Sequence, residues 1–560
     1  MNCVRQQDKL ALRLAGFVAA MVVLTLAGAT ITAQGQTYTV LYQAPNDGLD
    51  PENPGGQSIA QGRDGNLYFG SYAGGTASYG TLFNLTPAGK VAVVYPVGDF
   101  TQSGATLGTD GNFYGTNRDG GSNGDCFPSS CGQVYKITPG GVQTILHTFT
   151  NSDGYFPVAA PIEGTDGKFY GTVPTSSGTY NSILYSVTPS GTFTMLHTFT
   201  SAEGQNVTAG LIQGTDGNFY GVAVSGGANN YGSIFKMTSA GAVTVLHSFD
   251  YSDGANPYYP LVQASDGSLY GSTYNGGLGV GVIFKITASG AYSVLHELDV
   301  NAGDGEGPNS SLTQGSDGKL YGVTGAGPNG HSGTIFNIST TGTFTTLYTF
   351  CPSGNNCTDG VNPQSPVRQN TNGTFYGTTV NGGDGCNTDN CGVVFSLNMG
   401  LGPFVGLVNT SGKEGSTSEI LGQGFDASST VKFGGVLATS IKRIGTTFIA
   451  ATVPAGALTG TVTVTTGAAK LTSNQQFRVT PQVLSFTPPS GPVGTSVTIT
   501  GVGLTQTLGV GFGDKVPATN LKVISDTEVT ADVPEGAKTG KVGVETKGGI
   551  ATSTGTFTVN

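Results

Sequence analysis

One short turn sequence is repeated along this chain, and its recurrence constrains the fold more than any other feature. The strings GTDGNFYGT at 108–116, GTDGKFYGT at 164–172 and GTDGNFYGV at 214–222 are almost identical. The turn recurs seven times, centred on Asp64, Asp110, Asp166, Asp216, Asp266, Asp317 and Asn372, at spacings of 46 to 56 residues. Repeats of this length indicate a solenoid or a propeller.

Each copy carries four strand-like segments. In the copy at 209–249, AGLIQGT precedes Asp216-Gly217, NFYGVAV follows it, and SIFKMT and AVTVLHSF come after a Gly/Asn-rich loop. Asp-Gly between two such runs is a strong hairpin signal, because glycine accepts a positive φ. Four strands at a fixed period are typical of a propeller blade. The sequence therefore predicts an all-β fold with a seven-bladed β-propeller over 37–399.

The two ends of the repeat array complement each other. The segment TYTVLYQ at 37–43 is similar to the fourth strand of a copy, whereas the last copy stops after its third strand, GVVFSLN at 392–398. We expect the N-terminal strand to complete the last blade. One strand plus three would close the ring and leave no open sheet edge.

The connections fall into two classes. Turns between strands one and two, and between strands three and four, are short, and we expect them on one face, the Asp-Gly turn face. Connections between strands two and three and between blades are longer and differ from copy to copy. We expect these on the opposite face, the variable loop face. Variable loops on a rigid scaffold are where binding usually occurs.

The repeated strings GTDGNFYG-x-T, VFKIT and TVLHSF resemble the bacterial Gly-rich tandem-repeat family called GloVer, over roughly 37–398. This resemblance implies an extracellular propeller-like array. It implies no particular chemistry, because members of that family lack an assigned one.

Two units of about eighty residues follow the array, at 402–479 and 481–560. Both alternate strand-like runs with turn signals, which predicts two Ig-like β-sandwiches. The second resembles an IPT/TIG domain through SGPVGTSVTITGVGL and VPEGAKTG. The first keeps GQGF and VPAGALTG but has SGKEGS in place of SGPVGT. The resemblance implies spacers or binding modules of surface proteins.

The N-terminus has the features of a secretory signal peptide. Three basic residues precede an apolar run at 14–28, and small residues then mark a cleavage site after residue 29, with residue 33 as the second choice. A retained membrane anchor is the alternative, but the run is short for a spanning helix. We expect a secreted, extracellular or cell-surface protein with no membrane span after cleavage.

The net charge argues against nucleic acid as a partner. The whole chain has a formal charge of -11, and removing 1–29 takes away three bases and one acid, which leaves -13. Phosphate contact needs clustered Lys and Arg. An acidic exported protein is a poor candidate for it.

Six cysteines remain after cleavage, in close pairs around polar loops. The pairs are Cys126 with Cys131, Cys351 with Cys357, and Cys386 with Cys391. In an oxidising compartment we expect three local disulfides. Zinc is the rival interpretation, but no pair has the C-x2-C spacing and no histidine is close in sequence.

Four histidines occur at matching places in the fourth strand. They are His147, His197, His247 and His296, and the other copies have Tyr42, Tyr95 and Tyr348 there. A place that accepts His or Tyr selects a flat ring with a polar edge rather than acid-base chemistry. We therefore expect a structural role.

Acidic residues in the inter-blade loops are candidates for calcium. The best are Asp153, Asp253, Asp304 and Asp359. A calcium site needs six or more oxygens in one place, and Asp-Gly is mainly turn chemistry. Calcium stays an alternative at these positions, and we expect no other cofactor.

The function predicted from the sequence is that of an exported, non-catalytic binding or surface-interaction protein. Its variable loop face would bind an extracellular polysaccharide or protein, and the Ig-like domains would act as stalk or adhesion modules. We assign no catalytic residue, since H-E-x-x-H and P-loop motifs are absent. Two alternatives stay open: a carbohydrate-active hydrolase or lyase on the same face, and a purely structural surface-layer component. The chain has no Trp, so Tyr and Phe would have to serve as sugar platforms.

Overall fold

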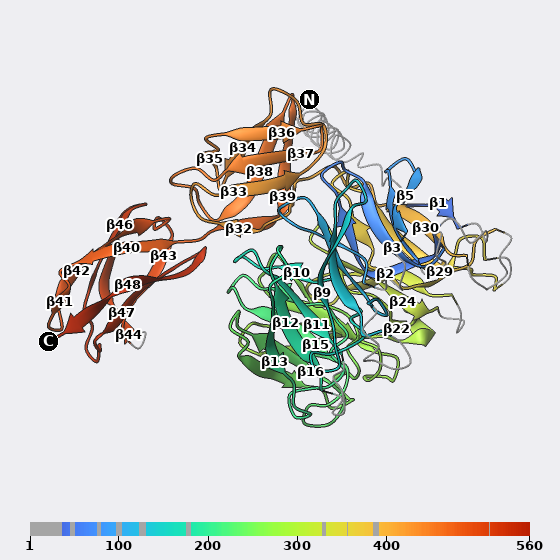
Figure 1. The fold of residues 1–560 in the computed structure, drawn as a ribbon, viewed down its shortest axis with the longest axis horizontal. Coiled ribbons are helices and arrows are strands. Elements are labelled where there is room, and N and C mark those ends of the chain that lie inside the picture. The colour runs from blue at the N-terminus through green and yellow to red at the C-terminus, as the bar shows by residue number, and fades with distance from the viewer. Residues whose placement is uncertain are drawn as a thin grey trace, which may run out of the picture.

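The computed structural model describes residues 36–44, 51–74, 80–96, 103–121, 130–174, 181–327, 332–354, 357–384, 391–513 and 516–560. The expected signal peptide lies outside these residues. The all-β class is confirmed, since the described residues form strands and one 3₁₀ turn, η1 (Val300–Ala302). The repeat array, coloured blue to yellow in Figure 1, forms one body, and two C-terminal domains in orange and red follow outside it.

Seven antiparallel sheets, one for each copy of the turn, make up the described array. The first strands are β2 (Glu52–Gln61), β6 (Thr106–Leu107), β10 (Ile162–Glu163), β14 (Ile212–Gln213), β18 (Val262–Gln263), the pair β22 (Glu306–Pro308) and β23 (Thr313–Gln314), and the pair β27 (Val361–Pro363) and β28 (Arg368–Gln369). The second strands are β3 (Leu67–Ala73), β7 (Phe113–Asn117), β11 (Phe169–Val173), β15 (Phe219–Ala223), β19 (Leu269–Thr273), β24 (Leu320–Ala326) and β29 (Phe375–Asn381).

The third and fourth strands complete each sheet. The third strands are β4 (Thr81–Leu85), β8 (Gln133–Ile137), β12 (Ile183–Val187), β16 (Ser233–Met237), β20 (Val282–Ile286), β25 (Thr334–Ile338) and β30 (Val393–Asn398). The fourth strands are β5 (Val91–Pro96), β9 (Gln143–Thr148), β13 (Phe193–Thr198), β17 (Val243–Ser248), β21 (Tyr292–Glu297), β26 (Phe344–Thr349) and, in the seventh sheet, β1 (Thr37–Gln43).

The two middle strands of each sheet form the core. Every residue of β15 is buried, whereas the fourth strand β17 is only partly buried. Glycine in the FYG string has a packing reason: a Cβ on Gly221 would lie 2.5 Å from Cζ of Phe235 on β16. The ring of the third strand therefore covers the glycine of the second.

The repeated Asp-Gly turn has two functions in the structure. Gly217 has a φ of 81°, which a side chain would strain. The carboxylate of Asp216 accepts hydrogen bonds from the backbone N–H of Asn218 (3.1 Å) and from the hydroxyl of buried Tyr220 (2.7 Å). One aspartate thus caps the turn and accepts a hydrogen bond from a buried phenol. These two roles explain why the residues around it recur.

Neighbouring sheets are joined by one repeated hydrogen bond. The backbone N–H of Thr215 donates to Oε1 of Gln263 in the next sheet (2.9 Å). The same bond links the last copy to the first, from Thr371 to Gln61 (3.0 Å). In addition, β1 pairs antiparallel with β30. The N-terminal strand therefore lies at the edge of the last sheet.

Two sandwiches follow the array, each with two facing sheets around one apolar core. In the first sandwich, one sheet has the strand order β31 (Gly406–Leu407), β33 (Thr417–Leu421), β37 (Phe448–Thr452), β36 (Ile441–Ile444). The other sheet has the order β32 (Ser411–Gly412), β39 (Ala469–Val479), β38 (Gly460–Thr466), β34 (Thr430–Phe433), β35 (Val436–Leu437). In the second sandwich, one sheet has the strand order β40 (Gln482–Thr487), β42 (Ser496–Val502), β46 (Glu528–Asp532), β45 (Thr519–Ser525). The other sheet has the order β41 (Ser490–Gly491), β48 (Gly549–Val559), β47 (Gly540–Thr546), β43 (Thr507–Phe512), β44 (Val516–Pro517). The strand orders are equivalent.

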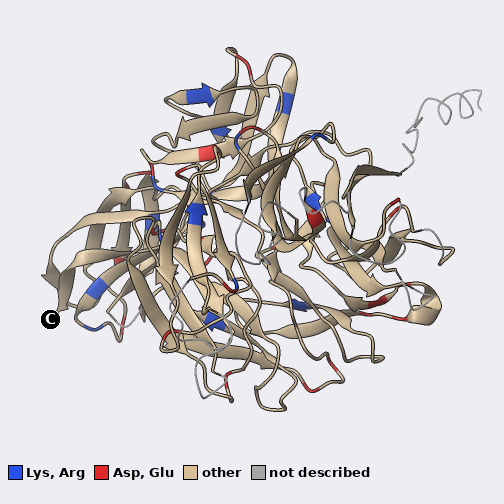
Figure 2. Cartoon of the chain, turned by 45° about the vertical axis from the view of Figure 1, so that its right-hand side comes forward, with Lys and Arg blue, Asp and Glu red and all other residues tan. Residues whose placement is uncertain are grey.

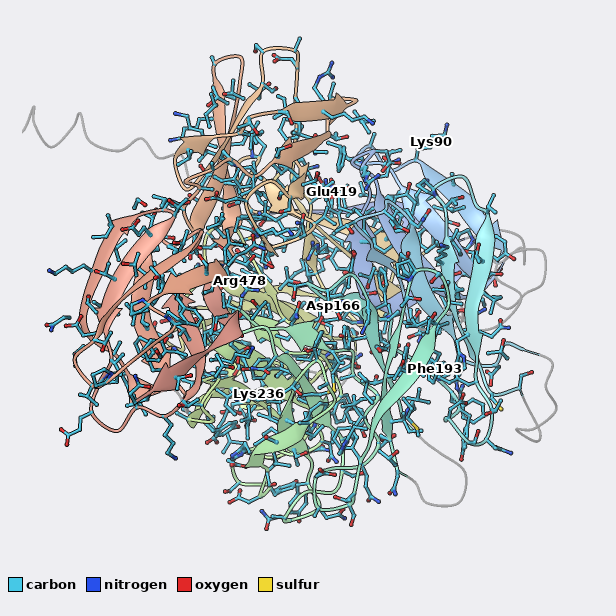
Figure 3. The ribbon with its side chains drawn as sticks, turned by 60° about the vertical axis from the view of Figure 1, so that its left-hand side comes forward. Lys90, Asp166, Phe193, Lys236, Glu419 and Arg478 are labelled. Carbon is cyan, nitrogen blue, oxygen red and sulfur yellow. A yellow bond between two sulfur atoms is a disulfide. The ribbon has the colours of Figure 1, made fainter. Side chains whose placement is uncertain are left out.

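The first sandwich docks on the Asp-Gly turns of the array. Arg63, in the turn of the first copy, pairs with Glu419 of β33 at 2.5 Å, and its carbonyl accepts a hydrogen bond from Thr447 (2.8 Å). Arg478 of β39 donates to the carbonyl of Thr215. Figure 3 labels two of the sandwich residues that make these contacts, Glu419 and Arg478. The docked face is opposite to the variable loops, because turns and loops lie at opposite ends of the strands.

Candidate functional site

Asn256 joins three segments of the variable loop face. It adopts a left-handed conformation, with a φ of 55°. Its backbone N–H donates to the carbonyl of Tyr231 (2.9 Å), and its carbonyl accepts from the N–H of Tyr274 (3.1 Å). Loops of the fourth and fifth copies are therefore held together at one point.

Four tyrosines around this joint form an exposed aromatic surface, which we call the tyrosine patch. Of the aromatic side chains in the described residues, the exposed ones are Tyr231, Tyr251, Tyr258 and Tyr274, at 37 to 42% of their full surface. Tyr231 contacts Tyr251 with ring centroids 5.3 Å apart, and Tyr258 contacts Tyr274 edge to face at 5.8 Å. Exposed aromatic groups gathered in one place mark a binding surface.

Two further tyrosines lie beside the patch. Tyr259 donates to Oδ1 of Asn309 (2.8 Å), and Tyr72 reaches Oε1 of Gln364 at 3.5 Å. Burial raises the pKa of Tyr72 to about 12. Burial also raises the pKa of Tyr259, and the nearby Tyr72 raises it further by a smaller amount. Residues of the first, fifth, sixth and seventh copies thus meet near Tyr259. Tyr259 immediately precedes a residue of the central cavity, Pro260.

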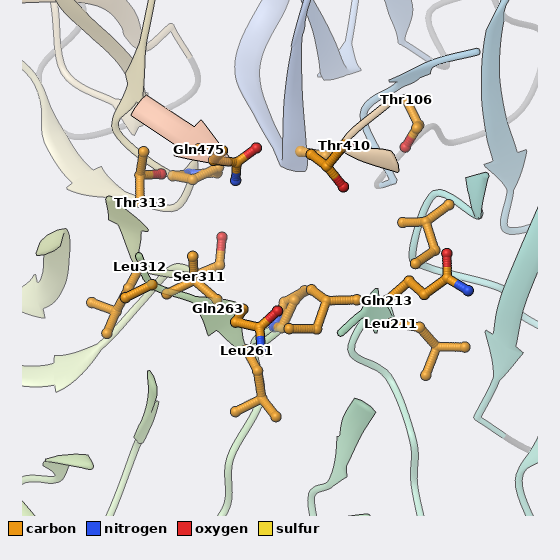
Figure 4. Close-up of a pocket in the computed structure, with 18 of the residues that line it drawn as sticks. Thr106, Leu211, Gln213, Leu261, Gln263, Ser311, Leu312, Thr313, Thr410 and Gln475 are labelled. Carbon is orange, nitrogen blue, oxygen red and sulfur yellow. The ribbon is translucent and has the colours of Figure 1, made fainter. Parts of the chain in front are cut away.

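A cavity of about 610 Å³ lies between the first strands of the array and the C-terminal sandwiches. Figure 4 shows Gln213 and Gln263 of the array below the space of the cavity and Thr410 and Gln475 of the first sandwich above it. Its volume is in the range of small-molecule sites. The sandwich therefore completes a cavity that the array alone would leave open at that end.

The four matching histidines all have structural partners. The ring of His147 stacks on Phe193 of the next sheet at 3.7 Å, and its Nε2 lies 2.9 Å from Asp153. His197 pairs with Glu203 at 3.2 Å and His296 with Asp304 at 2.8 Å, while Nε2 of His247 is 2.8 Å from Asp253 without hydrogen-bond geometry. In the sixth copy Tyr348 takes the place of histidine and donates to Asp359 (2.8 Å). The rings serve sheet packing.

The same contacts place all four calcium candidates beside a fourth-strand ring. Burial alone would raise the pKa of Asp153, but hydrogen bonds from His147 and Thr150 outweigh it and hold that pKa below its usual range. In the part of the chain that the structure describes, no three His, Cys, Asp or Glu side chains gather as a metal site would require. His331, Cys126 and Cys386 lie outside this part.

The Cys351–Cys357 disulfide is present, with Cα atoms 4.8 Å apart. Cys131 and Cys391 are also disulfide-bonded, but their expected partners lie outside the described residues. These bridges are not in the tyrosine patch. The patch was not predicted from the sequence, although the concentration of Tyr in 231–274 is a signal for it.

Charged groups give no indication of a nucleic-acid surface. Figure 2 shows the few Lys and Arg residues scattered over the described chain rather than gathered in one stripe. The described residues also include no apolar helix of the length that crosses a membrane.

The pattern of the Gloeobacter/Verrucomicrobia repeat matches this chain three times, at 28–212, 100–299 and 159–388. Together these matches cover more than half of the sequence. The chain belongs to the Gloeobacter/Verrucomicrobia repeat family. The IPT/TIG domain also matches, at 481–559, so the expected composition of GloVer-type repeats with a C-terminal IPT/TIG domain is confirmed.

Other similarities of this Gloeobacter/Verrucomicrobia repeat protein are remote. No curated protein matches its sequence. Among solved structures it is similar to SGBP-B from a complex xyloglucan utilization locus in Bacteroides uniformis (20% identity, 28% of this chain, 48% of that chain, TM-score 0.15). It is also similar to the surface glycan-binding protein PbSGBP-B from Prevotella bryantii (18% identity, 28% of this chain, 38% of that chain, TM-score 0.22). A third similar structure is a fungal alcohol oxidase of the AA5 family (14% identity, 93% of this chain, 100% of that chain, TM-score 0.40). The chain spans less than half the length of the two glycan-binding proteins, and likeness at these TM-scores is too low to indicate a shared function.

Proposed function

We propose that this protein is an exported, non-catalytic binding protein whose tyrosine patch binds an extracellular carbohydrate. The observation that carries the proposal is the gathering of the exposed aromatic side chains on one face. Tyrosine has an apolar ring face for the pyranose ring and a hydroxyl for its polar edge, at a low cost in side-chain entropy. In a chain without Trp, tyrosine is the best available platform.

The scaffold that we propose for this site is a closed seven-bladed propeller over 37–399, followed by Ig-like domains at 402–479 and 481–560. The pairing of β1 with β30 and the Thr371–Gln61 hydrogen bond support closure. A closed ring has no free sheet edge and holds its loops rigidly. Rigid loops preorganise the patch, so that little ordering entropy opposes binding.

Export is part of the proposal. The basic residues and apolar run of 1–29 support a signal peptide, and the Cys351–Cys357 disulfide supports an oxidising compartment. The docked sandwiches would then present the propeller from the cell surface or in the medium.

Among the described residues, two neighbouring acids with raised pKa values bear on the hydrolase alternative, and they lie away from the patch. Glu163 and Glu419 lie close enough to influence each other, and burial raises the pKa of both. However, Glu163 accepts two hydrogen bonds from Thr109, and Glu419 is paired with Arg63 under the docked sandwich. This pair belongs to the interface on the Asp-Gly turn face, opposite the patch.

A binding screen of the mature chain against cell-wall and plant polysaccharides tests the proposal. Tyr258→Ala with Tyr274→Ala should weaken binding at least about tenfold, because both exposed rings are removed. Met195→Ala, an exposed residue on the outer strand β13, is the control and should bind normally. A polysaccharide that binds both proteins equally would show that the site is elsewhere.

The same samples separate the alternatives. Release of reducing ends from a bound polysaccharide would favour the hydrolase. If neither polysaccharide nor oligosaccharide binds, with or without calcium, the carbohydrate proposal is wrong and a structural surface role is favoured.

A further inference from the structure

Arg368 is the exception among seven equivalent positions. In every copy one residue of the first strand lies opposite the repeated tyrosine of the second strand, and in the seventh copy Arg368 lies opposite Tyr376. The equivalents in the other copies are Ala60, Thr106, Ile162, Ile212, Val262 and Thr313. The fold therefore accepts a small or apolar neutral residue at this place, and the architecture does not require an arginine.

The guanidinium of Arg368 lines the central cavity. Burial lowers the pKa of Arg368, and no carboxylate is close enough to oppose that effect. Its side chain nevertheless keeps open surface, because it faces the empty space of the cavity. Among the described residues none accepts a hydrogen bond from it. A guanidinium that has no protein acceptor and is exposed to the space of the cavity is available to pair with an anion there.

Two further cations belong to the lining, which is otherwise largely neutral. Arg478 and Lys547 from the two sandwiches line the same cavity, and the acid among the lining residues is Asp266. The carboxylate of Asp266 is already bonded to Tyr270 (2.8 Å) and Lys285 (3.0 Å). In a chain with a net charge of -11, this is a local excess of positive charge, which favours an anionic ligand.

The size and polarity of the cavity narrow the class of anion. Its volume of about 610 Å³ is larger than a simple inorganic ion needs. Apolar Leu211, Leu261 and Leu312 alternate with amide and hydroxyl groups along the lining. A mixed lining fits a hydroxylated ring, and a guanidinium binds a carboxylate through two parallel N–H donors. We infer that the central cavity binds a sugar acid, with its carboxylate on Arg368.

This site is separate from the proposed glycan surface. The exposed residues Gln475, Gln476 and Lys547 belong to the sandwiches and form its rim, whereas the tyrosine patch is made by loops at the other end of the strands. The docked C-terminal domains are thus part of the cavity site. Loss of binding at the patch would leave this inference intact.

Isothermal titration calorimetry on the full mature chain tests the inference, with galacturonate, galactose and inorganic phosphate as probes. Galacturonate should bind at least about tenfold more tightly than galactose, because only the acid pairs with the guanidinium. Its affinity should also fall as the salt concentration rises. This second measurement needs no variant.

Arg368→Thr is the matched substitution, because threonine occupies this position in two other copies and the sheet accommodates it there. It should weaken galacturonate binding at least about tenfold. Arg443→Thr removes the same charge from an exposed strand, and this variant should bind galacturonate as tightly as the unaltered protein does. Tyr258→Ala with Tyr274→Ala should also leave galacturonate binding unchanged.

Three results would overturn the inference. Galacturonate could fail to bind the unaltered protein, or bind Arg368→Thr equally well. Phosphate could bind as tightly as galacturonate and be lost with Arg368, which would identify a simple oxyanion site and contradict the sugar-acid class.

Discussion

The ring of Tyr38 lies flat against the ring of Tyr348, with centroids 4.0 Å apart and planes 8° from parallel. Tyr38 is on β1, and Tyr348 is on the fourth strand of the sixth sheet. His147 and Phe193 make the same stack between two consecutive sheets inside the array. The N-terminal strand therefore makes with the sixth sheet the same contact that fourth strands make between consecutive sheets inside the array, as the fourth strand of the seventh sheet would.

Tyr38→Ala should loosen the attachment of β1 to the array. The substitution removes the stack and the hydrogen bond from the Tyr38 hydroxyl to the carbonyl of Asp359 (2.6 Å), at a cost of about 2–4 kcal/mol. Amide hydrogen exchange should then accelerate in β30 but not in β16 of the fourth sheet. Thr39→Ala, an exposed change on the same strand, is the control. Equal protection of β30 in both variants would argue against a role for this stack in closure.

Much of the fold could be predicted because the repeat encodes it locally. Asp216, Gly217 and Tyr220 lie within five residues, and the turn, its cap and the buried phenol follow from them. The fourth-strand pattern at 37–43 could likewise be recognised and matched to the segment that lacks it at 392–398. Information of this kind is carried by neighbouring residues, so a sequence shows it directly.

The docking and the site could not be predicted, because they depend on distant residues. Arg63 and Glu419 are 356 positions apart and share no motif. Tyr274 in the patch is exposed while Tyr270, four residues earlier, is buried, and composition does not distinguish them. The acidic partners of three of the four histidines had a usable signal, since Asp153, Glu203 and Asp253 each follow a histidine by six residues.

Arg63→Met should weaken docking of the first sandwich. The change keeps an aliphatic contact with Phe448, whose ring lies 4.7 Å from the guanidinium, but leaves Glu419 enclosed without its cation. Burial already raises the pKa of Glu419, and Arg63 partly offsets that effect. Since Arg63 is partly exposed, we expect a loss of about 2–3 kcal/mol. Small-angle scattering should show a more extended molecule.

Glu419→Gln in the Arg63→Met background is the internal check for the docking contact. It removes the unpaired carboxylate, so part of the lost stability should return. Arg443→Met, on the exposed strand β36, should change neither stability nor shape. A double variant no more stable than Arg63→Met would contradict the ion-pair explanation.

The stability that the contact between His147 and Asp153 contributes should change with pH in the acid range. The folded-state pKa of Asp153 is lowered, so its carboxylate adds stability above the pKa of the unfolded chain, about 4. That contribution is lost as the pH falls through the folded-state value. Asp153→Asn should therefore lower the free energy of unfolding at pH 6 by about 1 kcal/mol, which thermal denaturation shows as a lower midpoint. The difference from the unaltered protein should shrink toward pH 2.5.

Glu297→Gln controls for general charge effects, because Glu297 is exposed on β21. Its midpoint should differ from that of the unaltered protein by a similar small amount at each pH. A deficit of Asp153→Asn that stays constant between pH 6 and pH 2.5 would count against the proposed hydrogen bond.

Glu414 and Asp526 form an acid pair between the two sandwiches. Burial first, and then a hydrogen bond with Asp526, raise the pKa of Glu414 to about 7, although Glu414 also accepts from the N–H of Gly456 (2.7 Å). Burial alone would raise the pKa of Asp526, but hydrogen bonds led by Thr505 hold it below its usual range. Below about pH 7 the shared proton therefore resides on Glu414, whose carboxyl group donates a hydrogen bond to the carboxylate of Asp526.

The sandwich contact should weaken as the pH rises. Since the docked state has a pKa for Glu414 of about 7 and the separated state an ordinary one near 4.5, docking takes up a proton, and the contact loses stability from pH 4.5 to pH 7. Small-angle scattering should show the sandwiches closer together at pH 5.5 than at pH 8. Glu414→Gln donates at every pH and should abolish the difference, whereas exposed Glu535→Gln should keep it. A pH response that persists in Glu414→Gln would assign the effect to other groups.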